Sequence, residues 1–156
     1  MNNKGFTLVE LLATISLLAV LMLIAVPNII GVVNKNKNKT YVEDAKKLVA
    51  LAEYKVRAVS TYKPGNGSYK CITMNELGTG DFDTTAPNGG KYDSNLSYVR
   101  VSMTNDGSLE YKVTIVEKKN DNTYIGILKE TNENELYKDE TAPLISSSNN
   151  ETKKCQ

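Results

Sequence analysis

One carboxylate stands in the apolar N-terminal stretch of this chain. Glu10 is the single ionisable side chain between Phe6 and Val26, and the residues after it are apolar apart from Thr14 and Ser16. A carboxylate near the centre of a membrane helix costs on the order of 2.5 to 3.5 kcal/mol, so such a residue usually has a partner or a function. The chemistry that Glu10 offers is the neutralisation of a positive charge in dry surroundings.

The apolar run is long enough to cross a membrane once. It covers 21 residues from Phe6 to Val26, and a spanning helix needs roughly 20 apolar residues at about 1.5 Å each. A secretory signal peptide would have small residues at a cleavage site behind its apolar core. Here the small residue, Gly5, comes before the run, so a cut behind Gly5 would leave the helix on the mature protein.

The residues at this junction resemble the leader of type IV pilin and pseudopilin precursors. A short polar leader, Met1 to Lys4, precedes the string G-F-T-L-V-E-L-L, and Glu10 would be the fifth residue after a cut behind Gly5. Pro27, the 22nd residue of that mature chain, falls where many of these proteins have a helix-breaking proline. The resemblance covers roughly the first third of the chain.

The resemblance implies a role for each of these residues. Gly5 and Phe6 would be the junction cut by a membrane-embedded prepilin peptidase, which would then N-methylate Phe6. Glu10 would neutralise the N-terminal amine of an adjacent subunit in a helical homo-oligomer, assembled by a pilus ATPase and membrane platform proteins. A second interpretation needs no neighbour, because a carboxylate early in a helix is favoured by the helix dipole and could pair with its own chain's amine.

Pro27 is expected to disturb the helix. A proline inside a helix deletes a backbone hydrogen bond and clashes with the preceding turn, at a cost of about 3 kcal/mol. By similarity to the family, the turns just ahead of Pro27 would unwind in the filament. The alternative is a simple kink.

The composition argues against an enzyme. The 156 residues carry a net charge of +1, and loss of Lys4 leaves 18 basic and 18 acidic side chains, so no overall basic field indicates nucleic acid binding. The chain has no histidine and two cysteines. Neither a Cys-His or Ser-His couple nor the usual nitrogen and sulfur ligands of zinc can be built. We predict no catalytic residue, cofactor or metal.

The two cysteines, Cys71 and Cys155, predict one disulfide. In an exported head domain a single pair of cysteines is most simply bridged, and a loop of that size stabilises the fold by roughly 4 to 5 kcal/mol on chain-entropy grounds. The alternative is two free thiols, with Cys155 on a frayed tail.

The sequence also contains candidate ligands for calcium and a candidate surface for DNA. A loop with carboxylates and amides offers calcium its preferred oxygen ligands but matches no known motif, so solvated side chains are the favoured interpretation. The nine tyrosines and the Lys35 to Lys39 run could form a DNA surface, although tyrosines spread this evenly are typical of packing. The calcium candidates are Asp81, Asp83, Asn88, Asp93 and Asn95.

The periodicity predicts an α+β fold, with a long N-terminal helix packed on a small antiparallel head. We divide the chain into a removed leader (1–5), an apolar helix (6–33), its amphipathic continuation (34–62) and a head (63–156). Apolar residues recur at steps of 3 and 4 in the continuation, which predicts a stripe that packs on the head. The stripe is Val42, Ala45, Leu48, Val49, Ala52, Val56 and Val59.

In the head, alternating apolar residues predict three strands at about 96–103, 109–115 and 123–128. Asn105-Asp106-Gly107 would turn the chain between the first two. Thr73-Met74-Asn75-Glu76 is a capping-box pattern that predicts a short helical turn. We expect a three-stranded antiparallel meander across the helix stripe, one short element at Leu136-Tyr137, and a tail that is loose unless Cys155 anchors it.

Two features of the sequence bear on the orientation in the membrane, and they disagree. Lys35, Lys37 and Lys39 follow the apolar run, and the positive-inside rule alone would place the head in the cytoplasm. The leader requires Gly5 on the cytoplasmic side, so we expect the head to lie outside. The protein is expected in the cytoplasmic membrane before assembly and in a surface pilus afterwards. The alternatives are a pseudopilin or minor pilin of a secretion or competence system, and an anchored surface protein that never polymerises.

Overall fold

A single helix, α1 (Leu8–Ala58), opens the chain. The computed structural model describes residues 5–78, 80, 82–119, 123–138, 145–149 and 155, and only the backbone at 27 and 28. The chain forms two units, Met1–Asn36 and Lys37–Gln156, and α1 contributes residues to both. Each unit is described by itself.

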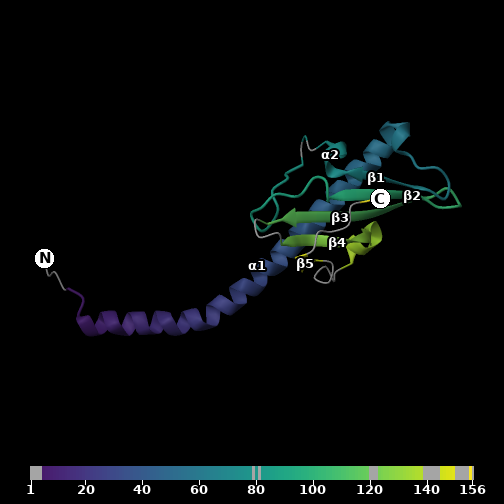
Figure 1. Cartoon of the computed structure of the whole chain (residues 1–156). Coiled ribbons are helices and arrows are strands. Elements are labelled where there is room, and N and C mark those ends of the chain that lie inside the picture. Colours follow the sequence, from purple (N-terminus) through teal and green to yellow (C-terminus); the bar gives the residue numbers. More distant parts are fainter. Residues whose placement is uncertain are drawn as a thin grey trace. The chain divides into compact units, whose positions relative to one another are not determined.

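The second unit combines the later turns of α1 with one antiparallel sheet (Figure 1). Its strands follow one another in chain order, so each pairs with its neighbour in sequence. Short helices lie before and between them: η1 (Ser60–Tyr62), α2 (Met74–Leu77) and η2 (Glu133–Tyr137). The strands are β1 (Tyr69–Thr73), β2 (Tyr98–Met103), β3 (Leu109–Lys118), β4 (Tyr124–Asn132) and β5 (Ser146–Ser148).

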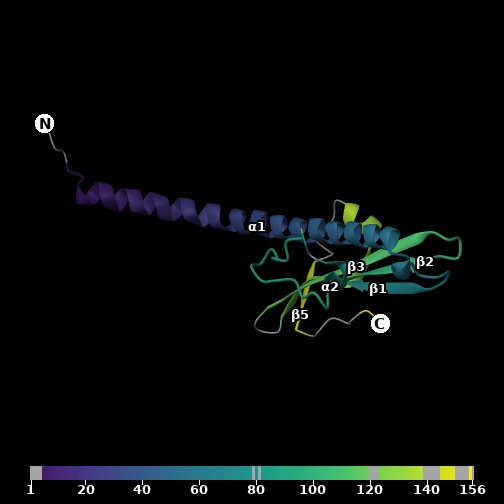
Figure 2. The same cartoon turned by 90° about the horizontal axis from the view of Figure 1, so that it is seen from above.

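The apolar stripe of α1 forms one side of the core of this unit. Seen from above, this part of the helix runs along one side of the sheet (Figure 2). Its buried residues pack with inward residues of the strands, such as Ile72, Val99 and Ile115, all fully buried. The buried stripe residues are those predicted, from Val42 to Val56, with Tyr41 in addition. Val59 is 41% exposed, contrary to prediction, because α1 ends at Ala58.

The sheet has five strands where the sequence predicted three. The three predicted strands correspond to β2, β3 and β4, and the turn between β2 and β3 lies at the predicted place, with Gly107 at a φ of 85°. The two additional strands are the edges, β1 and β5. They are short, five and three residues long, and β5 is all serine, so neither shows the apolar alternation that identifies a strand.

The first unit is helical and exposes its apolar side chains. Within the described residues, α1 is the one helix long and apolar enough to cross a membrane, and none of its most apolar window is buried. The helix continues through Pro27. The predicted unwinding ahead of Pro27 concerns the filament and stays a prediction.

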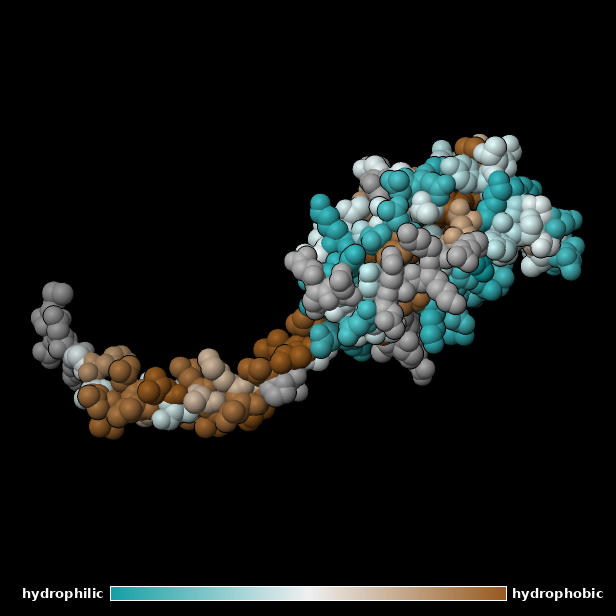
Figure 3. Space-filling view, viewed as in Figure 1, coloured by the Kyte–Doolittle hydropathy of each residue, from teal (hydrophilic) through white to brown (hydrophobic). Residues whose placement is uncertain are grey.

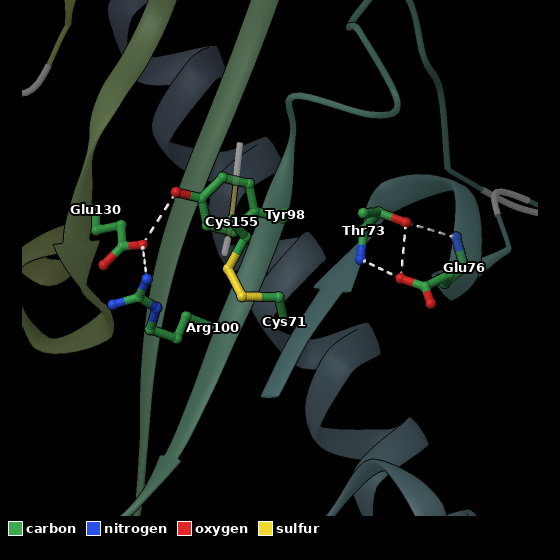
Figure 4. Close-up of a disulfide and its surroundings, with 7 residues drawn as sticks. All are labelled: Cys71, Thr73, Glu76, Tyr98, Arg100, Glu130 and Cys155. Atoms are coloured by element: carbon green, nitrogen blue, oxygen red, sulfur yellow. Dashed lines mark hydrogen bonds and ion pairs between the residues drawn. A yellow bond between two sulfur atoms is a disulfide. The ribbon is translucent and has the colours of Figure 1, made fainter. Parts of the chain in front are cut away.

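A disulfide joins Cys71 on β1 to Cys155, as predicted (Figure 4). The two Cα atoms are 5.9 Å apart, and the bridge links residues 84 positions apart in sequence. Because β1 is an edge strand, the bridge ties the end of the chain to the side of the sheet opposite β4 and β5. The covalent loop includes strands β2 to β5.

The head also buries charged groups that the residue pattern does not predict to be buried. Glu117 of β3 is fully buried and accepts hydrogen bonds from the Tyr41 hydroxyl, the Asn88 amide and, at 3.1 Å, the backbone N–H of Gly90. A Cβ at Gly90 would lie 2.6 Å from the Glu117 carboxylate, so this approach requires glycine. These contacts fasten the connection before β2 to both the helix and the sheet.

A second buried carboxylate, Asp44, lies on α1 about one turn after Tyr41. Asp44 is 6% exposed, accepts a 2.9 Å hydrogen bond from the Tyr92 hydroxyl and pairs with Lys47 at 3.0 Å. Burial, followed by the neighbouring carboxylates, raises the pKa of Tyr92, and burial together with the hydrogen bond to Glu117 raises that of Tyr41. Both phenols therefore stay protonated in the folded head beyond the pH at which an exposed tyrosine ionises.

Loss of the disulfide is expected to destabilise the head strongly. The double variant Cys71→Ser/Cys155→Ser should lower the free energy of unfolding by about 2 to 5 kcal/mol, because the unfolded chain regains the entropy that the loop removed. Chemical denaturation of the full chain in detergent micelles measures the change. Ser147→Ala, on an exposed serine of β5, is the control and should alter stability by less than about 0.5 kcal/mol; equal effects would exclude a structural role for the bridge.

The buried tyrosines predict a loss of stability in alkali. An unfolded tyrosine ionises near pH 10, whereas burial raises the pKa values of Tyr41 and Tyr92 in the fold. The two tyrosines therefore make their full contribution to the free energy of unfolding below about pH 10. This contribution declines as the pH rises further, because the unfolded state then loses its phenol protons first. Tyr92→Phe should flatten this decline by up to about 1.4 kcal/mol per pH unit. Unfolding measured between about pH 9 and 11.5 tests this, and Tyr54→Phe, on a ring that is 73% exposed, should keep the wild-type slope.

Candidate functional site

The N-terminal junction is accessible. Phe6 is 83% exposed, and Gly5 has no atom within 4 Å of where a Cβ would be. Both residues precede the first helical residue, Leu8, so the peptide bond between them is outside the hydrogen-bonded helix. An extended, unobstructed peptide of this kind is what a peptidase needs to bind its substrate.

Glu10 lies in the first turn of α1, where it caps the helix together with Thr7. One carboxylate oxygen, Oε2, accepts hydrogen bonds from the Thr7 backbone N–H and from the Thr7 hydroxyl, each at 2.8 Å. The Glu10 backbone N–H in turn donates to the Thr7 hydroxyl oxygen at 3.3 Å. This is the reciprocal pattern of a capping box, which satisfies amide groups that a helix start leaves unpaired.

Sequence reasoning missed Thr7, although a signal for it was present. The pattern Thr7-x-x-Glu10 is the same as Thr73-x-x-Glu76, which was predicted to cap α2 and does so. The two boxes agree in all three hydrogen-bond lengths, and Figure 4 shows the one in the head. A substitution of Glu76 therefore shows the effect of losing the capping interaction, and any additional effect of the same substitution at Glu10 comes from another role of that residue.

The capping box does not depend on the leader. Its donors and acceptors belong to Thr7 and Glu10, which both remain after a cut behind Gly5. Both side-chain hydrogen bonds end on Oε2, and a carboxylate has room for about four hydrogen bonds over its two oxygens. Glu10 can therefore keep its local partner and still accept a new amine.

The helix around Glu10 offers an apolar surface on all sides. Large apolar side chains from Leu8 to Val33 are 43 to 77% exposed, and the first unit is almost uniformly hydrophobic in the space-filling view (Figure 3). The hydroxyls of Thr14 and Ser16 donate to the carbonyls of Leu11 and Leu12 at 2.8 Å. These two hydroxyls are thus satisfied within the helix, which suits an apolar environment.

The calcium alternative gains no support from the described residues. Asp83 accepts a 2.9 Å hydrogen bond from the Thr85 N–H, which holds the pKa of the carboxyl below its usual range, and Asp93 accepts from the N–H groups of Asn95 and Leu96. Asn88 belongs to the Glu117 network. In the part of the chain that the structure describes, no three acidic, histidine or cysteine residues form a metal-binding group. Asp81 lies outside the described residues.

The tyrosines serve mostly as packing residues. Tyr41, Tyr92, Tyr98, Tyr111 and Tyr124 are each less than 9% exposed. Tyr98 and Arg100 of β2 contact Glu130 of β4 at 3.0 Å, a cross-strand link visible in Figure 4. A continuous stacking surface for nucleic acid bases would need these rings at the surface.

Comparison with known proteins identifies the N-terminal segment. Residues 1–26 match the model of the prokaryotic N-terminal methylation motif. No curated protein and no solved structure matches the chain. The match includes Gly5, Phe6 and Glu10 and ends one residue before Pro27.

This leader implies processing by a prepilin peptidase and pilus-type assembly. The family that carries it is one of structural, pilin-type proteins and is not a known enzyme class. Together with the apolar helix it fits a membrane-anchored protein. Residues 1–26 therefore carry the class III leader of type IV pilins, and the chain is supported as a type IV pilin-like precursor, a prepilin or pseudopilin.

Proposed function

We propose that this protein is a structural subunit of a type IV pilus, cut behind Gly5, methylated on Phe6 and polymerised through α1. The observation that carries the proposal is the lone carboxylate of Glu10, four residues behind the new N-terminus in a helix with an apolar surface. Before assembly the apolar segment lies in the cytoplasmic membrane with the head outside. After assembly the same segment forms the filament core.

Cleavage creates a cation that can pair with Glu10. A cut behind Gly5 converts the Phe6 amide nitrogen into an ammonium, which adds one positive charge beside an apolar surface. In a dry helical core, an ammonium and a carboxylate each cost several kcal/mol unless they are paired and hydrogen-bonded. A neighbouring copy shifted along the filament axis brings its ammonium to Glu10, and the pair sets the register between the two helices.

The capping box explains how the monomer tolerates Glu10 in the membrane. The Thr7 N–H and hydroxyl give the carboxylate two hydrogen bonds of 2.8 Å, and the N-terminal end of a helix favours negative charge by about 0.3 to 1 kcal/mol. These interactions reduce the cost of an unassembled carboxylate without neutralising its charge. An unneutralised charge is what favours the assembled state.

The first test concerns processing. The mature protein should begin at Phe6 with an N-methyl group, because Gly5 and Phe6 form an exposed junction outside the helix. Mass spectrometry of the N-terminal peptide from purified filaments measures this. A mature protein that retains Met1 to Gly5 would contradict the proposal and favour an anchored protein that does not polymerise.

The second test separates the charge of Glu10 from its capping role. Glu10→Gln keeps an oxygen that can accept from Thr7 but removes the negative charge, so processing should be normal while the yield of sheared filaments falls at least about tenfold, the loss of a paired buried charge. Glu76→Gln makes the same change in the equivalent capping box of α2 and should leave the yield unchanged. Wild-type yields from Glu10→Gln would reduce Glu10 to a helix cap.

A further inference from the structure

The proposed filament requires two different contact surfaces on each subunit. This inference rests on the proposed function. Copies of one chain joined in an open helical array use heterologous contacts, in which one patch of a subunit meets a different patch of the next. Residues 37–156 carry 17 basic and 17 acidic side chains, so the head is neutral overall, and attraction between heads depends on where the charges lie.

A lysine patch surrounds η1. Between residues 54 and 75 the sequence has four basic residues and no acidic one. The Lys55 amine lies 5.0 Å from the centroid of the Tyr62 ring and donates to the Glu76 carbonyl, and the Lys70 amine donates to the Thr61 carbonyl. Lys63 directly follows η1 and is exposed. Carbonyls and rings do not cancel a positive charge, so Lys55, Lys63 and Lys70 form a positive surface, the lysine patch.

The fourth basic residue, Arg57, is left out of this patch. Its guanidinium lies 3.6 Å from the carboxylate of Glu53, one turn back on α1. Other cations of the head likewise have carboxylate partners, such as Lys46 with Glu43 at 2.8 Å and Lys112 with Glu110 at 3.8 Å. Lys55 and Lys70 of the lysine patch differ from these cations, because their partners are a tyrosine ring and backbone carbonyls, which carry no net charge.

A glutamate patch lies on η2. Glu133 and Glu135 stand in a short helix that Leu136, 1% exposed, anchors in the core, and the Asn132 side chain caps it by accepting from the Asn134 N–H at 3.1 Å. Burial, and after it the negative charge of the neighbouring Glu53, raises the pKa of Glu133, so a further carboxylate lies close to this helix. Glu135 is exposed.

The two patches lie toward opposite edges of the sheet. Lys70 belongs to β1, which forms one edge, whereas η2 directly follows β4, which pairs with the other edge strand. In Figure 1, β1 lies on one side of the sheet and the yellow-green segment after β4 on the other. Surfaces of opposite charge on opposite edges can join copies side by side without either patch being used twice. We propose that the lysine patch of one copy binds the glutamate patch of the next copy in the filament.

A charge-reversal cycle on the full chain tests this pairing. Lys63→Glu and Glu135→Lys each alter one exposed side chain and place like charges in the contact, so each should lower the yield of sheared filaments about fivefold, the order expected for exposed ion pairs. The double variant Lys63→Glu/Glu135→Lys restores opposite charges in reversed order. Its yield should return to within about twofold of wild type.

Lys119→Glu is the matched control, because it reverses an exposed lysine that follows β3, away from both patches. It should assemble like the wild type. Single variants that assemble normally, or a double variant no better than the worse single, would overturn the pairing. A loss confined to Lys63→Glu would also overturn it and assign the lysine patch to another anionic partner.

The proposed function fails separately. If Glu10→Gln lowers the yield at least about tenfold while Lys63→Glu and Glu135→Lys keep the wild-type yield, the pilin function stands and the contact between heads is wrong. If the wild type forms no filaments, both fail together.

Discussion

The structure depends on one electrostatic constraint, the charge of Glu10 on a helix that is apolar on every side. The carboxylate has a local partner in Thr7, which lowers the cost of the charge but leaves it in place. In lipid or in a dry filament core the carboxylate keeps its charge at low cost only when a cation is paired with it. We propose that cleavage of the class III leader supplies that cation, so that the covalent processing of the N-terminus and the pairing of Glu10 belong to one mechanism.

The head meets a different requirement, which is to hold one fold against the later turns of α1. It packs the apolar stripe of α1 on the sheet, ties Cys155 to β1 through a disulfide, and fastens the connection before β2 through Glu117. Buried carboxylates contribute less to stability than apolar packing would, but they fix one geometry when all their hydrogen bonds are made. We propose that the edges of the head contact neighbouring copies, and a fixed geometry of the head serves such contacts.

Much of this was predictable from sequence because it depends on local pattern. The apolar run, the stripe of α1, the turn at Gly107 and the capping box at Thr73 all follow from residue spacing. The edge strands did not, because β1 is short and β5 consists of serines, and both are strands only through their pairing with β2 and β4. Asp44 and Glu117 also escaped prediction, since their burial arises from tyrosines 48 and 76 positions away.

The central claim is that the partner of Glu10 in the filament is the N-terminal amine of another copy. A density map of the sheared filament at side-chain resolution measures this directly. The account predicts the Glu10 carboxylate within about 4 Å of the Phe6 nitrogen of a neighbouring subunit, the distance of an ion pair. A Glu10 carboxylate that contacts only groups of its own chain, Thr7 among them, would contradict it.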